Sequence, residues 1–339
     1  MKIRHTLLFV TAIMLNFSAG AWCQDQHPAA APEEPRKVLQ RSSAEFLTAI
    51  EELKKSGTRP GLEPSQQDQL LLALHDLERV ENSAAIYNFG IYHMYRDIWS
   101  AQKGNVPVPV LLEIGPGVNI AQGVIFAMTG TKKYYALDIY RDPQFYNPYS
   151  YQAAATLLST VDPHAVTSKA ETVFRVEGDK VVFNPEKIEY LYPHQSYDIP
   201  LPASSVNYVF SHSVFEHISD PEATIKALFQ LLPSGGLTAH HFDLRDHTDF
   251  SKPLEFLKFD AASWKSRFDE RSVHMYTNRW RLPDFKAMFE KVGFRILKIE
   301  PTSKLPVTED IRRSLHPDFQ KYSLEDLSVL SAIIVAEKP

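Results

Sequence analysis

The chain has 339 residues, of which 44% are hydrophobic and 23% are charged, so it is long enough to bury at least one full core. Its formal net charge of −5 shows no excess of Lys and Arg, which argues against nucleic acid as a partner. The only cysteine, Cys23, excludes an intramolecular disulfide and a cysteine-based metal cluster.

Residues 1–22 have the order of an export signal. The basic stretch MKIRH precedes the apolar TLLFVTAIMLNFSAGAW, in which residues 19–21 offer a small-x-small cleavage site. The apolar stretch is short for a membrane span. We therefore predict a signal-peptide-like segment and an exported, periplasmic or membrane-tethered protein, with an N-terminal core helix as the alternative.

Two further segments precede the main domain. Residues 23–36 are rich in Pro, Ala and Glu and poor in aliphatic residues, which predicts a disordered linker. Residues 37–105 contain three helical patterns, and the second has leucines at 70, 71, 74 and 77 on one stripe. We interpret residues 37–105 as a helical N-terminal cap.

From residue 106 to residue 339 strands and helices alternate, which predicts an α/β domain with a doubly wound, mostly parallel, seven-stranded sheet. Strands are expected over residues 108–115, 133–140, 187–192, 205–213, 235–244, 294–301 and 328–339, and helices over 119–130, 151–161, 221–232 and 281–293.

The segment LEIGPGVN, residues 112–119, supplies a sharp turn after the first expected strand. Gly115 and Gly117 let the backbone bend and let a ligand approach without an intervening Cβ. Ligands of doubly wound sheets bind beyond the carboxyl ends of the strands, so this turn is the candidate cofactor turn. Ile120 stands where the dinucleotide fingerprint G-x-G-x-x-G has its last glycine, which disfavours a nicotinamide cofactor.

Two carboxylates near this turn decide between cofactors. Asp138 ends the second expected strand, 21 residues after Gly117, a spacing that suits a carboxylate accepting hydrogen bonds from ribose hydroxyls. Glu113 lies in an otherwise apolar strand, where a carboxylate is costly unless a cationic or donating group meets it. The ammonium group of a methionine moiety would meet that need, whereas a pyrophosphate would be repelled. The sequence therefore favours an S-adenosyl cofactor.

These residues and several longer blocks resemble the class I S-adenosylmethionine-dependent methyltransferases over roughly residues 106–339. The blocks are LEIGPG, the acidic strand end ALDIY, and YDIPLPASSVNYVFSHSVFEHISDPEATIKALFQLLPSGGL. The segments FRILKIEP and SAIIVAEKP look like the closing pair of strands of this family. The resemblance implies a Rossmann-like methyltransferase fold and S-adenosyl-L-methionine as the cofactor.

The resemblance also implies which residues hold the cofactor. Glu113, Gly115 and Gly117 would hold its methionine part, and Asp138 would bind the ribose hydroxyls. The chain departs from the family pattern at Asn119, which replaces the third small residue of the turn.

Further cofactor contacts are implied by the long block. Gln195 and Ser196 would contact the adenine, although an acidic residue is common in the family where Gln195 stands. Ser211, His212 and Ser213 would line the face where the methyl group is transferred. His217 in FEHI is interpreted as a wall of the cofactor pocket.

The segment HHFDLRDH, residues 240–247, brings His and Asp side chains to the end of the fifth expected strand. A hydroxyl or amine acceptor must lose a proton during methyl transfer. One interpretation makes His247 the general base, oriented by Asp246 or Asp243; the other makes DLRDH a salt-linked loop that closes the sheet edge. His212 is the second candidate base. Some bacterial methyltransferases of this class resemble the pair DLRDH and NRWR, residues 278–281.

Side chains alternate between the two faces of a strand, so His240 and His241 are not expected to face one pocket together. We predict no metal site, because the His and Asp residues of this loop lack the helical i, i+4 spacing of common metal motifs.

The sequence thus predicts a methyltransferase that uses S-adenosyl-L-methionine and a small-molecule or glycan-type acceptor with an oxygen or nitrogen nucleophile. One alternative is a non-catalytic exported binding module that retains the fold. A second alternative, a nicotinamide-dependent oxidoreductase, is disfavoured by Glu113 and Ile120. Because the cofactor is a cytosolic metabolite, a cytoplasmic location is the alternative to export or a membrane tether.

Overall fold

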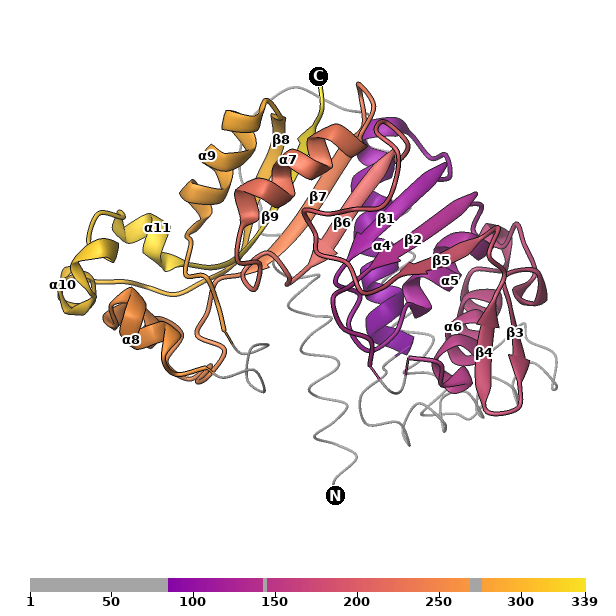
Figure 1. Cartoon of the computed structure of the whole chain (residues 1–339), viewed down its shortest axis with the longest axis horizontal. Helices are drawn as coiled ribbons and strands as arrows, with labels where there is room; N and C mark the ends of the chain where they lie inside the picture. Colours follow the sequence, from indigo (N-terminus) through magenta and orange to yellow (C-terminus); the bar gives the residue numbers. More distant parts are fainter. Residues whose placement is uncertain (1–84, 143–144, 269–275) are drawn as a thin grey trace. The chain divides into compact units, whose positions relative to one another are not determined.

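The computed structural model describes residues 85–142, 145–268 and 276–339 (Figure 1). The expected signal-like segment 1–22, the linker 23–36 and most of the cap 37–105 lie outside the described residues. Among the helices within the described ranges, none is long and apolar enough to cross a membrane.

Seven strands form one mostly parallel sheet in the order β5-β2-β1-β6-β7-β9-β8. β2 pairs with β5 in parallel and β6 pairs with β7 in parallel, whereas β9 is antiparallel to both β7 and β8. The strands are β1 (Val110–Ile114), β2 (Lys133–Leu137), β5 (Ile188–Leu191), β6 (Tyr208–His212), β7 (Leu237–Asp243), β8 (Arg295–Lys304) and β9 (Val329–Glu337). All seven predicted strands are present, and the predicted doubly wound sheet is confirmed.

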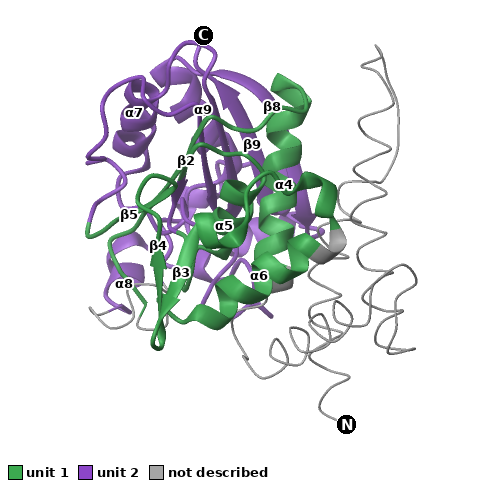
Figure 2. Ribbon diagram, turned by 90° about the vertical axis from the view of Figure 1, so that its right-hand side faces the viewer, with its two compact units in different colours: residues 1–15, 22–112, 116–193 green, residues 16–21, 113–115, 194–339 purple. Residues whose placement is uncertain are grey.

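The chain divides into two compact units, which are described separately (Figure 2). Within the described ranges, unit 1 contains residues 85–112 and 116–193, and unit 2 contains residues 113–115 and 194–339. Strand β1 therefore begins in unit 1 and ends in unit 2.

Three helices of unit 1 pack against one another: α4 (Ala85–Lys103), α5 (Ala121–Met128) and α6 (Pro148–Val161). Every residue of α5 is buried, as expected of a helix that is apolar on all sides. Tyr92 of α4 meets Phe126 of α5 edge to face, with ring centroids 4.8 Å apart. Helix α4, which the sequence placed in the N-terminal cap, thus packs on helices of the following domain.

A hairpin in unit 1 was not predicted from the sequence. It pairs β3 (Phe174–Glu177) with β4 (Lys180–Phe183) in antiparallel fashion across a two-residue turn. Phe183 packs against the rings of Tyr151 and Phe145, which attaches the hairpin to the region of α6. Two short 3₁₀ helices, η1 (Pro163–Ala165) and η2 (Ala170–Thr172), precede it.

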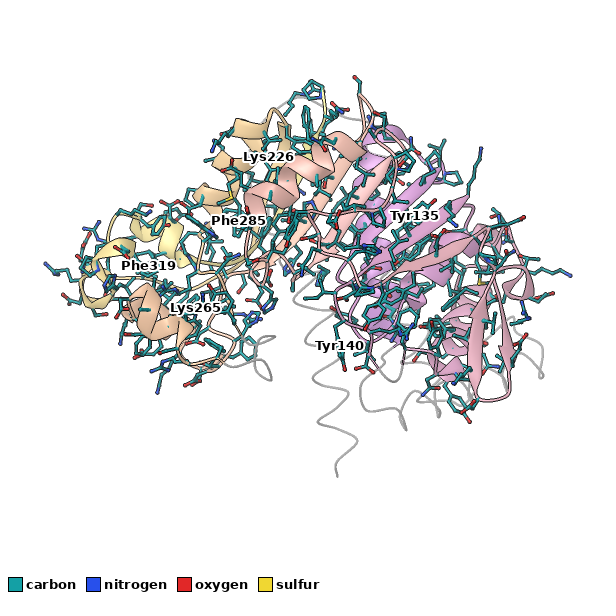
Figure 3. The ribbon with its side chains drawn as sticks, in the orientation of Figure 1. Tyr135, Tyr140, Lys226, Lys265, Phe285 and Phe319 are labelled. Carbon is teal, nitrogen blue, oxygen red and sulfur yellow. The ribbon has the colours of Figure 1, made fainter. Side chains whose placement is uncertain are left out.

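Helices α7 (Pro221–Leu231) and α9 (Leu282–Val292) lie side by side in unit 2 (Figure 1). The Asp220 side chain accepts a hydrogen bond from the Ala223 N–H at 2.9 Å, and Pro221 occupies the first turn of α7. Phe285 of α9, labelled in Figure 3, packs on Phe242 of β7 with ring centroids 4.5 Å apart. This packing buries one face of β7 under α9.

Short helices after β7 and after β8 build a second, smaller core in unit 2. They are η3 (Glu255–Lys258), α8 (Ala261–Lys265), α10 (Glu309–Ser314), η5 (Pro317–Phe319) and α11 (Leu324–Ser328). Trp264, Leu257, Leu327 and Phe319 belong to this core, and Phe319 is labelled in Figure 3. The Trp264 indole donates a hydrogen bond to the Thr277 carbonyl at 2.9 Å. The sequence did not predict these five elements.

Candidate active site

The first half of the glycine turn belongs to unit 2. Glu113 is 3% exposed in strand β1. Gly115 has φ +65°, and a Cβ at this position would lie 2.6 Å from a methyl carbon of Val214. Both the left-handed backbone and the lack of space therefore require glycine at 115.

The second half of the turn, in unit 1, is joined to the end of β2. Gly117 has φ +75°, and a Cβ there would meet no atom within 4 Å. The Asp138 carboxylate accepts a hydrogen bond from the Tyr140 N–H at 3.0 Å, and the N–H groups of Ile139 and Gly117 lie near enough to favour its charged form. Burial raises the pKa of Asp138, and these three N–H groups oppose the rise. The structure thus brings Gly117 and Asp138 together, with open space above the glycine.

Asn119, which departs from the family pattern, has a structural role in unit 1. It is 6% exposed, and its Oδ1 accepts hydrogen bonds from Asn88 Nδ2 and from the Ala121 N–H, both at 2.9 Å. The turn is thereby tied to α4 and to the start of α5, a contact that the sequence did not reveal.

The two residues expected at the adenine differ in their surroundings within unit 2. Gln195 is exposed. Ser196 is 8% exposed, and its Oγ lies 2.8 Å from Thr224 Oγ1 on α7. Their proposed contact with adenine stays a prediction.

The register of β6 and β7 places Ser211 and His240 on one face and His212 and His241 on the other. The prediction that His240 and His241 face opposite sides is therefore confirmed. Ser211 and His240 are both fully buried, with Ser211 Oγ 2.7 Å from His240 Nδ1. Ser211 thus takes part in the packing of unit 2, and its contact with a cofactor stays a prediction.

His212 and His241 form a stacked pair, with ring centroids 4.4 Å apart and an interplanar angle of 11°. Ser213 has φ +56°, a strained conformation for serine, and its Oγ lies 3.1 Å from His241 Nδ1. Burial lowers the pKa of His212 well below its ordinary value and lowers the pKa of His241 to about 4. Both imidazoles are therefore neutral at pH 7.

The DLRDH loop is held together by ion pairs and turns. Arg245 binds the Asp243 carboxylate with two nitrogens, Nε–Oδ1 at 2.8 Å and Nη2–Oδ2 at 2.5 Å. Burial would raise the pKa of Asp243, but Arg245 and the nearby His247 hold it well below its ordinary value. His247 Nε2 lies 3.7 Å from Asp243 Oδ2, whereas Asp246 Oδ1 accepts two hydrogen bonds from Thr248. Of the two predicted orienting residues, Asp243 is therefore the one beside the His247 imidazole.

Asn278, the first residue of NRWR, holds the FEHI segment. Its Nδ2 donates hydrogen bonds to the carbonyls of Phe215 at 2.7 Å and Ile218 at 2.9 Å. Its backbone N–H donates to the Glu216 carbonyl at 2.7 Å. This side chain fixes a loop 60 residues away in sequence, which explains part of the NRWR pattern.

The two arginines of NRWR also have structural partners. Arg281 is fully buried, and its guanidinium donates hydrogen bonds to the carbonyls of Leu244 and Val329, both at 2.6 Å. Burial lowers the pKa of Arg281 to about 10, so it stays charged at pH 7. Arg279 donates to the Phe259 carbonyl at 2.6 Å.

Glu216 is a buried carboxylate that the sequence did not single out. It is 2% exposed, and its Oε1 accepts a hydrogen bond from the Asp243 N–H at 3.0 Å. Burial, with Asp243 nearby, raises the pKa of Glu216 well above its ordinary value. The signal in the sequence that could have found this residue is a carboxylate between the apolar residues of FEHI.

A model of the family described as a methyltransferase domain matches residues 73–299. No curated protein matches the chain. Similar solved structures include phosphoethanolamine N-methyltransferase 2 of Haemonchus contortus, which is 15% identical with a TM-score of 0.40 over 78% of this chain and 60% of that one. The S-adenosylmethionine-dependent methyltransferase of Mesorhizobium loti is 11% identical, with a TM-score of 0.36 over 70% of this chain and 96% of that one. The one of Methanosarcina mazei is 16% identical, with a TM-score of 0.35 over 69% of this chain and 93% of that one. Identities and TM-scores this low carry no conclusion about an acceptor.

Proposed function

Because the chain belongs to the class I S-adenosylmethionine-dependent methyltransferases, we propose that it methylates an oxygen or nitrogen of a small-molecule or glycan-type acceptor. The observation that carries this proposal is the position of two histidines: His212 is the last residue of β6, and His247 follows the carboxyl end of β7. Ligands of doubly wound sheets lie beyond these strand ends. The net charge of −5 argues against nucleic acid as the acceptor.

The residues of the glycine turn suit the family cofactor, S-adenosyl-L-methionine, which supplies a methyl group on a sulfonium cation when bound. Glu113 offers a buried carboxylate for an ammonium group, and Gly117 leaves space where a Cβ would stand. Asp138 is held by the Tyr140 N–H and lies near the Gly117 N–H, which supports its role toward the ribose. These side chains would bind and orient the cofactor.

We propose that one of two histidines is the general base that takes the proton of the acceptor. His212 is neutral at pH 7 and stacks on His241, so its ring is held in one orientation. His247 is the second candidate, with Asp243 rather than Asp246 beside its imidazole. General-base catalysis contributes about 10²–10⁴-fold to a rate, so loss of the base is measurable.

Calorimetry with S-adenosylhomocysteine tests the cofactor site of the full-length chain. We expect one binding site, and we expect Asp138→Asn to weaken binding by about tenfold or more, since one lost hydrogen bond to a charged group is worth roughly 1.5–3 kcal/mol. Asp179→Asn, in the exposed turn of the β3–β4 hairpin, is the matched control. Binding of NAD alone would support the oxidoreductase, and binding of neither would support a non-catalytic module.

Transfer of labelled methyl groups to panels of hydroxyl, amine and glycan compounds then tests turnover. Once an acceptor is found, the turnover of His212→Ala and of His247→Ala is compared with that of the unaltered chain, after calorimetry has shown that each variant binds S-adenosylhomocysteine as tightly. Unchanged turnover in either variant removes that histidine as the base.

A further inference from the structure

Three metal-ligating side chains meet at one place in unit 2. Glu216, His217 and His247 each offer one ligand atom, and these atoms all lie within 4.8 Å of one another. Glu216 and His217 follow β6, whereas His247 follows β7, so two loops contribute to the cluster. The rings of His217 and His247 have centroids 4.8 Å apart.

Two of the three side chains carry buried polar atoms that lack a partner. Glu216 Oε2 and His247 Nε2 find no hydrogen-bond partner among the residues that the structure describes. The distance from His247 Nε2 to Asp243 Oδ2, 3.7 Å, is too long for a hydrogen bond. Buried polar atoms without partners are costly, and each calls for a ligand or another explanation.

The remaining polar atoms of the cluster are used to orient it. His217 Nδ1 lies 2.7 Å from the Tyr276 carbonyl, so Nδ1 carries the proton and the lone pair is on Nε2. Glu216 Oε1 accepts the Asp243 N–H at 3.0 Å, which holds the carboxylate. Histidine and carboxylate ligands of metals are oriented by outer hydrogen bonds of this kind.

Although the sequence pattern alone predicts no metal site, we propose that Glu216, His217 and His247 bind a divalent transition-metal ion such as Zn²⁺, Mn²⁺, Fe²⁺ or Co²⁺. His247 is then a ligand, which leaves His212 as the candidate general base. Two imidazoles and one carboxylate are a ligand set for these ions, whereas Ca²⁺ and Mg²⁺ prefer oxygen ligands. Metal–ligand distances are about 2.0–2.2 Å, so the three ligand atoms must move closer to one another by on the order of 1 Å when the ion binds.

Three protein ligands leave coordination positions for water or for an oxygen or nitrogen of a bound molecule. The cluster follows the carboxyl ends of β6 and β7, and ligands bind beyond these strand ends in this fold. The charge of the nearby Arg245 is compensated by its two-nitrogen ion pair with Asp243. Three protein ligands are typical of sites that hold a reacting molecule, whereas sites that only stabilise a fold have four.

Cobalt binding tests the site on the full-length chain. After treatment with a chelator, the protein is titrated with Co²⁺ at pH 7.5, and the visible absorption of the ion reports its coordination. We expect one equivalent to bind, and we expect Glu216→Gln and His247→Ala to weaken that binding by about 100-fold or more. The exposed His164→Ala is the control and should bind as the unaltered chain does.

Glu216→Gln keeps Oε1 as an acceptor for the Asp243 N–H, so its fold is expected to survive, and a thermal melt checks this. Absence of Co²⁺ binding at 1 equivalent by the unaltered chain, or equal binding by Glu216→Gln and His247→Ala, would overturn the site. Calorimetry with S-adenosylhomocysteine is run on the same samples, so loss of metal binding is separated from loss of the cofactor site.

Discussion

The imidazole of His240 is held between two hydroxyl groups in the core of unit 2. Its Nδ1 lies 2.7 Å from Ser211 Oγ, and its Nε2 lies 2.5 Å from Thr238 Oγ1. Burial lowers the pKa of His240 to about 3, so the folded protein keeps the ring neutral. The ring thus satisfies two buried hydroxyls while carrying no charge.

This burial makes the stability of the protein depend on pH. In the unfolded chain a histidine has a pKa near 6.5, so between about pH 6.5 and 3 only the unfolded state binds this proton. The stabilisation is therefore complete above pH 6.5 and is lost as the pH falls. We expect the free energy of unfolding to decrease by about 1–2 kcal/mol from His240 alone between pH 6.5 and 5, as measured by urea denaturation.

The variant His240→Gln identifies the source of this pH dependence. It should be less stable at pH 7.5 and lose less stability on acidification than the unaltered chain, with His164→Gln as an exposed control. His212 and His241 also have lowered pKa values, so the slope should become shallower without vanishing. An unchanged slope in His240→Gln would contradict the assignment.

At the scale of elements, the loop after β6 depends on a side chain that lies far away in the sequence. Asn278 donates hydrogen bonds to the Phe215 and Ile218 carbonyls, and its N–H donates to the Glu216 carbonyl. The backbone that carries Glu216 and His217 is thus held from outside its own segment.

Removing this side chain should loosen the loop. Asn278→Ala leaves two carbonyls without a donor, which we expect to cost about 1–3 kcal/mol in the free energy of unfolding. The exposed Asn105→Ala is the matched control, measured by urea denaturation of both variants. Equal stability of the two variants would show that water replaces the Asn278 contacts.

Strands and long helices could be predicted because each carries its own hydrophobic pattern. The β3–β4 hairpin could not, since only Phe174 of the four β3 residues is buried and the pattern of alternation is missing. The short helices of the second core in unit 2 were missed for a related reason, because α8, α10 and α11 have five or six residues each. Segments this short carry too few residues to show a helical period.

The candidate site could be predicted only where its residues lie close together in the sequence. The glycine turn, the end of β2 and the DLRDH loop were located, because their positions follow from the strands that precede them. Partners could not be assigned: Asn119 meets Asn88, and Asp243 rather than Asp246 lies beside His247. Such pairings depend on tertiary packing that no local pattern encodes.

For the whole molecule, residues 1–22 raise the question of location. We propose that this segment directs export or tethers the chain to a membrane, supported by its basic start, its apolar stretch and the small residues 19–21. Mass analysis of the N-terminus of the protein isolated from cells should find a start just after residue 21. If the protein is found in the cytosol with residues 1–22 intact, the alternative of a cytoplasmic location, where the cofactor is made, is supported.

Strand β9 lies between β7 and β8, although it follows both in the sequence. Among the described strands, β8 pairs with β9 alone, so β8 has no sheet partner until residues 329–337 have been synthesised. Arg281 likewise needs the Val329 carbonyl. On a ribosome, which releases the chain from its N-terminus, unit 2 can therefore close its sheet only after β9 has emerged from the exit tunnel.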